Sequence, residues 1–149
     1  MYGRERNISM GTNIRAQLSK NNKYWISRHR YYELKHFCLQ YPQWKKAYAA
    51  IGDLSIQSAT WEEWLPKTNR PSDPTGDCAV ARVYYWERMI MIEKIAMETD
   101  KELRLYILRA VTEDLSFTYL TTKLDMPCGK DMYYDRYRKF FWLLSKERQ

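Results

Sequence analysis

Apolar residues recur along much of this chain at the three- and four-residue spacing of helices. From Ser27 they fall on one helical face, and this first helix must end before Pro42, because a residue that precedes proline is pushed out of the helical region. Pro42 is suited to open a second helix and Gly52 to close it. The pattern therefore predicts a helical hairpin over residues 25–52.

A long helix is predicted from Pro74 or Thr75 to about Thr99. Its apolar residues form two adjacent stripes, Ala79, Val83, Trp86, Ile90 and Met97 in the first and Tyr85, Met89, Ile92 and Ala96 in the second. Only the strip with Glu87, Lys94 and Glu98 is polar. A helix this apolar has to be covered on two sides, either within the monomer or by a second copy of the chain.

Three shorter helices complete the pattern. Asp100 is a good N-cap for a helix over residues 103–111, and Ser116 for one over residues 116–124. Asp125 to Gly129 must form a turn, and the last helix then runs from Lys130 to about Lys146. There is no convincing strand pattern and no internal repeat. The expected fold is all-α, a multi-helix bundle.

Two segments lack this periodicity. Residues 1–24 contain two Gly and several Ser and Asn, so we expect a flexible basic N-terminal arm. Residues 53–73 form a connector that is longer than compact domains normally contain, as expected for a hinge or for a segment that lies across a partner. Residues 74–149 are then a helical domain that ends in a helix-turn-helix over residues 116–146.

Charge is distributed unevenly along the 149 residues, whose formal net charge is +7. Residues 1–35 hold eight Lys and Arg against two acids, residues 36–128 hold eleven against thirteen, and residues 129–149 hold six against three. Two basic ends on a nearly neutral body are typical of proteins that bind a phosphate backbone. A solvated tail and a charged helix face would give the same counts. Aromatic residues make up 15% of the chain, which suits either a binding surface or a core.

Catalytic and metal-binding patterns are lacking. His29, His36 and Cys38 have no fourth ligand at a suitable spacing, so we expect no metal and no cofactor. Cys128 lies beside a helix N-terminus and Lys130, which can lower the pKa of a thiol, but no base accompanies it and we expect no enzyme activity. The three cysteines are widely spaced and no apolar run is long enough for a membrane, so we expect a reducing cytoplasm and no membrane contact.

The stretch from Leu115 to Arg148 carries most of the functional signal. A short helix, a turn containing Gly129 with the apolar Met126 inside it, and a longer helix form the layout of a helix-turn-helix. Five residues of the longer helix should pack inward: Tyr133, Tyr137, Phe140, Phe141 and Leu144. The first turns of such a helix meet base edges, so the candidates for base contact are Lys130, Asp131, Tyr134, Asp135 and Arg138. Arg136 and Lys139 are candidates for phosphate contact.

This stretch resembles a known family. The segments LRLYILRAV (103–111), LSFTYL (115–120) and MPCGKDMYYDRYRKFF (126–141) are similar to the helix-turn-helix of sigma-70 region 4. They resemble more closely the sigma-like C-terminal domains of small transcriptional regulators that phages and prophages of Gram-positive bacteria encode. The resemblance covers about a third of the chain. The family's turn has a capping Ser where this chain has Pro127, and the turn here is one residue longer.

The resemblance implies a sequence-specific DNA-binding regulator of late phage transcription, acting in the cytoplasm of the bacterial host. Its partner would be double-stranded DNA, with residues 130–146 in the major groove. The arm would follow the phosphates through Arg4, Arg6, Arg15, Lys20 and Lys23. The aromatic helices would then form a scaffold or a homodimer.

Two other functions remain open. The same module could bind a protein, such as host RNA polymerase or a host defence nuclease complex. Tryptophan often anchors protein interfaces, so the candidates for that contact are Trp44, Trp61 and Trp64. A small terminase subunit for DNA packaging is the third possibility, and it would require a ring oligomer.

Overall fold

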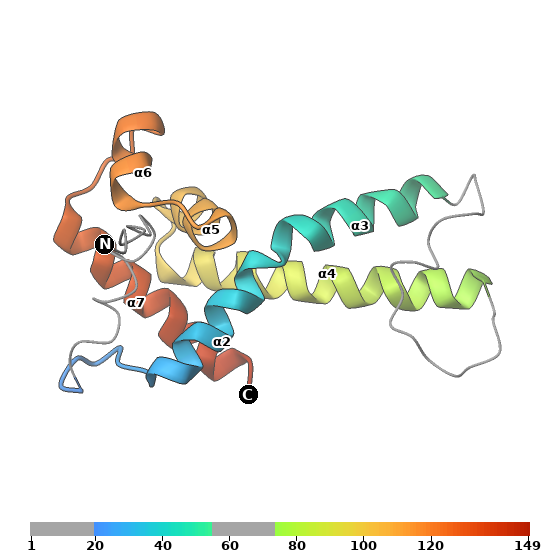
Figure 1. The fold of residues 1–149 in the computed structure, drawn as a ribbon, viewed down its shortest axis with the longest axis horizontal. Coiled ribbons are helices and arrows are strands. Elements are labelled where there is room, and N and C mark those ends of the chain that lie inside the picture. The colour runs from blue at the N-terminus through green and yellow to red at the C-terminus, as the bar shows by residue number, and fades with distance from the viewer. Residues whose placement is uncertain (1–19, 55–73) are drawn as a thin grey trace, which may run out of the picture. The chain divides into compact units, whose positions relative to one another are not determined.

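The structure is a computed structural model that describes residues 20–54 and 74–149. This part of the chain is helical and contains no strand, as the sequence predicts. Most of the predicted arm and connector lies outside the described residues, and with it Arg4, Arg6, Arg15, Trp61 and Trp64. The helices in Figure 1 are α2 (Arg28–Leu39), α3 (Tyr41–Leu54), α4 (Pro74–Thr99), α5 (Arg104–Glu113), α6 (Phe117–Lys123) and α7 (Lys130–Glu147).

The described residues divide into two compact units. Unit 1 contains residues 20–39 and 92–149, and unit 2 contains residues 40–54 and 74–91. This division separates the two helices of the predicted hairpin over residues 25–52. α2 belongs with the C-terminal helices, because its buried face packs against α5 and α7. α3 belongs with the first part of α4.

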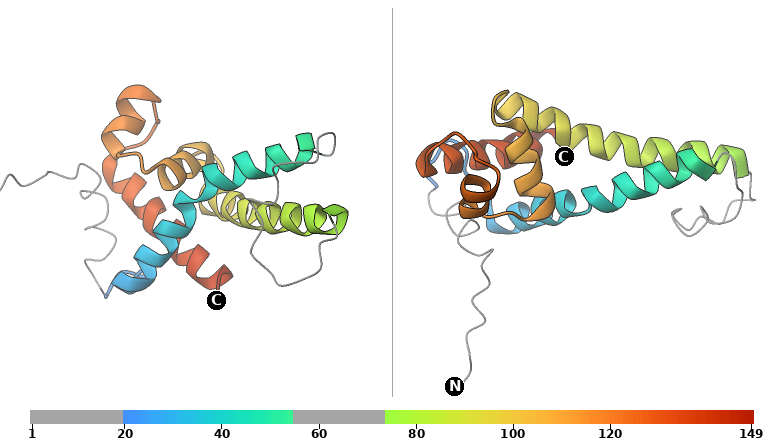
Figure 2. Two further views of the ribbon diagram at one scale, coloured as in Figure 1. Left: turned by 45° about the vertical axis from the view of Figure 1, so that its right-hand side comes forward. Right: turned by 90° about the horizontal axis from the view of Figure 1, so that it is seen from above.

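Unit 2 is a pair of antiparallel helices. α3 and residues 74–91 of α4 run side by side in both figures of the ribbon (Figures 1 and 2). Arg82 of α4 lies over the ring of Tyr48 of α3, 4.9 Å from its centre. The buried side chains of the pair are Tyr41, Trp44, Ala47, Ile51, Ala81, Tyr85 and Met89.

The sequence predicted that Gly52 closes α3. This prediction is wrong, because the helix continues to Leu54. Glycine destabilises a helix by about 1 kcal/mol relative to alanine. This is too little to end a helix that is stabilised by packing against a neighbouring helix. A Cβ atom at Gly52 would meet only the end of the Arg82 side chain, at 3.9 Å. The glycine is therefore tolerated in the helix without being required there.

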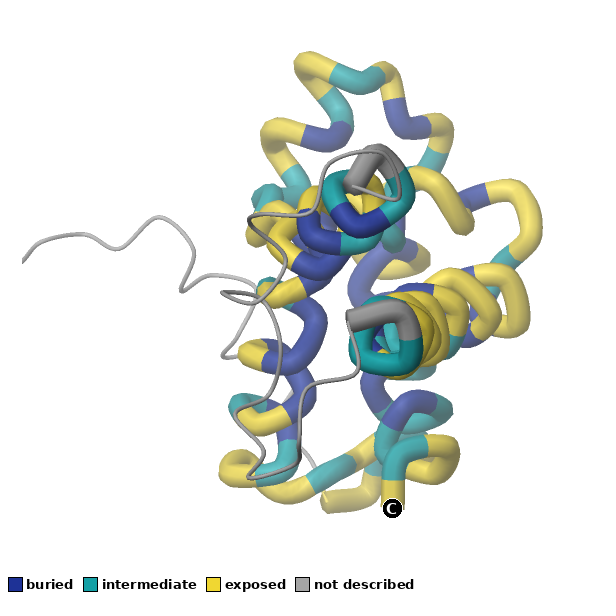
Figure 3. The backbone as a smooth tube through the Cα atoms, turned by 90° about the vertical axis from the view of Figure 1, so that its right-hand side faces the viewer, coloured by how far each residue is buried: buried dark blue, intermediate teal, exposed yellow. Residues whose placement is uncertain are grey.

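Unit 1 is built around α7. α2 crosses α7 (Figures 1 and 2), and the ring of Tyr31 lies 5.0 Å from that of Phe141. The hydroxyl groups of Tyr31 and Tyr137 are 2.7 Å apart and hydrogen-bonded inside this core. Arg30 ties the beginning of α2 to the end of α7, because its Nε donates to the Ser145 hydroxyl at 3.1 Å. Figure 3 shows that the helices of the molecule carry buried and exposed faces.

Capping residues define the ends of the shorter helices. Ser116 caps α6 as predicted, because its hydroxyl accepts a hydrogen bond from the Tyr119 N–H at 3.1 Å. Asp100 accepts from the backbone N–H groups of Glu102 and Leu103, and so caps a turn that precedes α5. Asp114 ends α5 in the left-handed region, with φ 56°. Its carboxylate lies 3.4 Å from Lys35 of α2 and links the two helices.

The two apolar stripes of α4 have different surroundings. The second stripe is buried, at Tyr85, Met89, Ile92 and Ala96. The first stripe is exposed: 53% of Val83, 50% of Trp86 and 40% of Ile90 are accessible. Despite its apolar character, neither α4 nor any other described helix is long and apolar enough to cross a membrane.

Candidate nucleic-acid interface

The predicted sequence of short helix, turn and long helix is present at residues 117–147. α6 packs on the N-terminal part of α7 through Phe117, whose ring lies 5.6 Å from Tyr133 and 6.2 Å from Tyr134. Met126 of the turn is buried, and its N–H donates to the carbonyl of Leu120 at 3.0 Å. The turn therefore contains a buried apolar residue, and its backbone is bonded to α6.

The conformation of the turn depends on an aspartate instead of a glycine. Asp125 has φ 52°, in the left-handed region that aspartate tolerates better than most residues. Gly129 has φ −77°, which any residue adopts, and it serves as the N-cap of α7. The interpretation of this segment as a turn is confirmed, but the residue with the unusual backbone is Asp125.

The buried face of α7 is wider than predicted. All five residues expected to pack inward are buried: Tyr133, Tyr137, Phe140, Phe141 and Leu144. Tyr134, a candidate for base contact, is also buried, with 7% of its surface accessible. The rings of Phe117 and Tyr133 cover it. Tyr134 therefore supports α7 from inside unit 1 and does not lie on its open side.

Two charged residues in the first turn of α7 are exposed to solvent. Asp131 is exposed at the N-terminal end of the helix, where a negative charge interacts favourably with the helix dipole. Lys130 is exposed beside it, where the same dipole disfavours a positive charge. Lys130 makes no salt bridge to another described residue. Lys130 therefore does not stabilise the helix from this position, and its ammonium group is accessible to an anionic ligand.

Arg136 is engaged within unit 1. Its Nε donates to the Asp100 carboxylate at 3.0 Å, and its Nη1 donates to Asp135 at 2.8 Å. Partial burial raises the pKa of Asp100, but hydrogen bonds from the Leu103 N–H, from Arg136 and from the Glu102 N–H outweigh it and hold this pKa below its usual range. The structure gives Arg136 a role in joining α7 to the turn before α5, and it neutralises Asp135.

Arg138 and Lys139 of α7 are both half-buried. The Nε of Arg138 is buried and finds no hydrogen-bond acceptor among the described residues. Lys139 forms no salt bridge there either. The contact of these two cations with DNA stays a prediction.

The second half of α7 adds residues that the sequence analysis missed. Trp142 meets Tyr24, which precedes α2, with ring centres 5.4 Å apart. Lys146 lies over the Trp142 ring, 3.4 Å from its centre, and Lys23 lies over the Tyr24 ring at 4.8 Å. We call the following set the basic–aromatic surface: Lys20, Lys23, Tyr24, Trp25, Lys139, Trp142 and Lys146.

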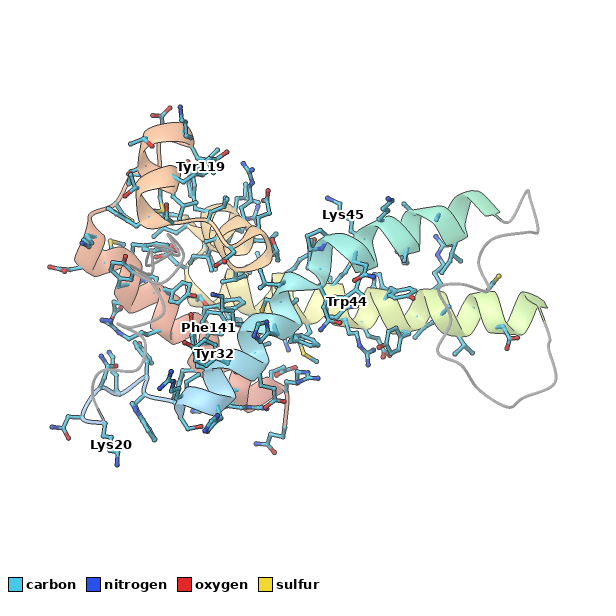
Figure 4. All side chains as sticks on the ribbon, viewed as in Figure 1. Lys20, Tyr32, Trp44, Lys45, Tyr119 and Phe141 are labelled. Atoms are coloured by element: carbon cyan, nitrogen blue, oxygen red, sulfur yellow. The ribbon has the colours of Figure 1, made fainter. Side chains whose placement is uncertain are left out.

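A sequence signal for part of this surface exists. Lys139, Trp142 and Lys146 are spaced i, i+3 and i+7, and so share one helix face. Lys20 and Lys23 were predicted as basic residues of the arm, but the contact of Tyr24 with Trp142 has no sequence signal, because it depends on α2 packing beside α7. Figure 4 shows Lys20 in the segment before α2, with its side chain directed away from the helices.

The other candidate residues are not assembled into a site. Trp44, a candidate for protein contact, is buried on α3 within unit 2 (Figure 4). His29 and His36 are exposed, Cys38 is fully buried, and no group of three or more metal-binding side chains occurs in residues 20–54 and 74–149. Burial raises the pKa of the Cys128 thiol and Asp100 adds to the effect, so the lowering suggested by its neighbours in sequence does not occur.

Comparison with known proteins identifies no relative. No model of a protein family matches the chain, and neither the curated proteins nor the solved structures give a significant match.

Proposed function

We propose that this protein binds duplex DNA through α6 and α7 and regulates transcription. The observation that carries this proposal is the α6–turn–α7 arrangement, in which α6 and the buried Met126 support a longer helix with an open, charged side. The resemblance of residues 103–141 to sigma-like regulators of phages supports the same function. A regulator of late phage genes is the specific role that this resemblance favours.

The described contacts refine the proposed roles of the residues. Lys130 and Asp131 are the exposed candidates for base contact on α7, and Arg138 is a half-buried one. Lys and Arg suit the acceptors of guanine, and Asp accepts from the amino group of cytosine. Tyr134 and Arg136 instead hold α7 in place, the first by packing and the second through Asp100.

Selection of bound duplexes from a random pool, followed by affinity measurements on the selected site, tests this proposal. We expect one preferred sequence for the unaltered protein. Arg138→Ala should weaken binding to that site about 5- to 150-fold and relax its preference at one position, because a good base contact contributes about 1–3 kcal/mol.

Lys101→Ala is a suitable control, because Lys101 is exposed in the turn before α5 and forms no salt bridge within the described part. It should bind the selected site as the unaltered protein does. Absence of duplex binding at low salt would contradict the proposal. Equal binding by the control and by Arg138→Ala would contradict the assigned role of α7.

A second candidate function is protein binding, and the exposed stripe of α4 favours it. Large apolar side chains are exposed on one face of α4 at Val83, Trp86 and Ile90. Exposed apolar patches of this kind often mark protein interaction sites. Purified bacterial RNA polymerase is the partner that the sigma-like resemblance suggests. Binding to the polymerase in the presence of nuclease, and its loss in Trp86→Ala, would support this function over direct DNA binding.

A further inference from the structure

We infer that the basic–aromatic surface of unit 1 holds the phosphate backbone of the DNA duplex. This inference rests on the proposed function and extends it. It places a second contact with DNA at the C-terminal half of α7 and at residues 20–25, away from the first turns of α7 where base contact is proposed.

The segment before α2 has a defined conformation beside α7. The Asn22 side chain accepts a hydrogen bond from the Tyr24 N–H at 2.9 Å, and the Asn22 carbonyl accepts one from the Trp25 N–H at 3.0 Å. The Tyr24 ring then meets the edge of Trp142. Lys23, which lies over the Tyr24 ring, is thereby held beside Trp142 of α7, which reduces the entropy lost when it contacts a ligand.

The aromatic rings position the ammonium groups without neutralising them. Lys146 and Lys23 each lie over a ring, and this attraction leaves their full positive charge in place. Lys139 lies one turn before Trp142 on the same face of α7. The surface thus presents two positioned positive charges, those of Lys23 and Lys146, at the contact between Tyr24 and Trp142.

Acidic residues do not offset these charges. The acids of the adjoining helices are engaged elsewhere: Asp135 pairs with Arg136, Glu147 lies 3.5 Å from Lys94, and Glu33 pairs with Arg30 and Arg148. Within residues 20–54 and 74–149, Lys20, Lys23, Lys139 and Lys146 make no salt bridge. An unpaired group of cations of this kind is complementary to a row of phosphates.

The packing of the rings favours a duplex over a single strand. Single strands bind by stacking their bases on open aromatic faces. Lysine side chains cover one face each of Tyr24 and Trp142, and these two rings also contact each other. Trp25 is the most accessible ring of the surface, with 37% exposed. Lysine, which acts as a point charge, can contact the phosphates of a duplex without any base being unstacked.

The salt dependence of duplex binding tests this inference. We would measure the affinity of the full chain for a fluorescent 20-base-pair duplex at several salt concentrations, by anisotropy. Each phosphate contact contributes about 0.9 to the slope of log affinity against log salt. Lys139→Gln with Lys146→Gln should therefore reduce this slope by about 2 relative to the unaltered chain.

Two further double variants make the result specific. Lys45→Gln with Lys46→Gln removes the same charge from exposed positions of α3 (Figure 4) and should leave the slope unchanged. Lys20→Gln with Lys23→Gln alters no helix and should reduce the slope by about 2. It therefore tests the surface even if the α7 variant fails to fold, which circular dichroism would reveal.

The outcomes separate this inference from the proposed function. Failure of the unaltered chain to bind any duplex at low salt overturns the proposed function. Duplex binding with unchanged slopes in both surface variants, or with an equal loss in the α3 control, overturns only the inference. Tighter binding to the matching single strand than to the duplex also overturns it.

Discussion

Tyrosine hydroxyl groups in the core of unit 1 differ in their hydrogen bonding. The hydroxyls of Tyr31 and Tyr137 bond to each other at 2.7 Å, whereas the buried Tyr133 hydroxyl finds no partner among the described residues. A buried polar group without a partner costs about 1–3 kcal/mol, while a paired one contributes modestly to stability. Burial raises the pKa of Tyr133 and of Tyr137, so both stay neutral.

Tyr133→Phe should therefore leave the free energy of unfolding unchanged or raise it by up to about 1 kcal/mol. Tyr137→Phe should lower it by about 1 kcal/mol, because it removes the hydrogen bond between the Tyr137 and Tyr31 hydroxyls. Urea unfolding followed by circular dichroism measures both. A clear loss of stability in Tyr133→Phe would show that its hydroxyl is hydrogen-bonded.

Asp100 makes stability depend on pH in the acid range. Its pKa is lower in the folded protein than the ordinary value of 3.8, so its contribution is fully present above that value. The contribution is lost as the pH falls through the lowered pKa, because protonation removes the charge that Arg136 and the backbone N–H groups stabilise. Asp100→Asn keeps the shape of the side chain but cannot carry this charge.

We expect Asp100→Asn to lower the free energy of unfolding by about 1–2 kcal/mol at pH 7, and by less at pH 3. Urea unfolding of both proteins at the two pH values provides the measurement. Arg136→Gln should also lower the free energy of unfolding at pH 7. Its slope of log DNA affinity against log salt should equal that of the unaltered protein. A reduced salt slope in Arg136→Gln would instead return this residue to the group of phosphate contacts.

Single-residue predictions from the sequence succeeded where one local pattern decides the outcome. Ser116 caps α6 because its hydroxyl needs only the N–H three residues later. The burial of Tyr134 was not predictable in this way. The pattern of α7 gives the centre of its buried face, but the width of that face depends on where Phe117 of α6 packs.

At the scale of helices, α4 shows what an apolar pattern does and does not determine. The spacing predicts its bounds, Pro74–Thr99, and the presence of two apolar stripes. It does not predict which stripe is buried, because both are equally apolar and the choice depends on the partner helices. The structure buries the stripe with Met89 and exposes the stripe with Trp86.

This difference predicts unequal effects of truncation in unit 2. Met89→Ala should lower the free energy of unfolding by about 2–4 kcal/mol, since it leaves a cavity beside α3. Trp86→Ala should lower it by about 1 kcal/mol in a monomer, less than Met89→Ala, because half of Trp86 is already accessible. Thermal unfolding at two protein concentrations checks both.

A large effect of Trp86→Ala that grows with protein concentration would contradict the second expectation. It would indicate that a second copy covers the exposed stripe of α4, as the sequence analysis allowed. Equal losses in the two variants at every concentration would mean that another part of the same chain covers it.

At the scale of the whole molecule, the structure places basic residues from both ends of the sequence in one unit. Residues 20–35 and 129–149 are far apart in the chain, yet α2 packs against α7 in unit 1. The sequence analysis grouped residues 25–52 as one helical hairpin. In the structure α2 packs against α5 and α7, which lie about 75 and 100 residues further along, where local spacing carries no information.

The basic residues near the N-terminus allow a test of the arm that lies outside the described residues. If Arg4, Arg6 and Arg15 contact phosphates, replacing all three by Gln should reduce the slope of log affinity against log salt by about 3. The same duplex titration provides the measurement. An unchanged slope would restrict the DNA contacts to the described residues.

The pairing of α2 with α7 also affects how the protein is made. α2 leaves the ribosome early, but the aromatic residues that cover Tyr31 are synthesised about 100 residues later. At about 5–20 residues per second, this delay lasts on the order of 5–20 s. α3 and α4 are synthesised during that interval. The core of unit 1 is incomplete until translation reaches α7, so we expect the apolar face of α2 to stay accessible to chaperones and proteases until then.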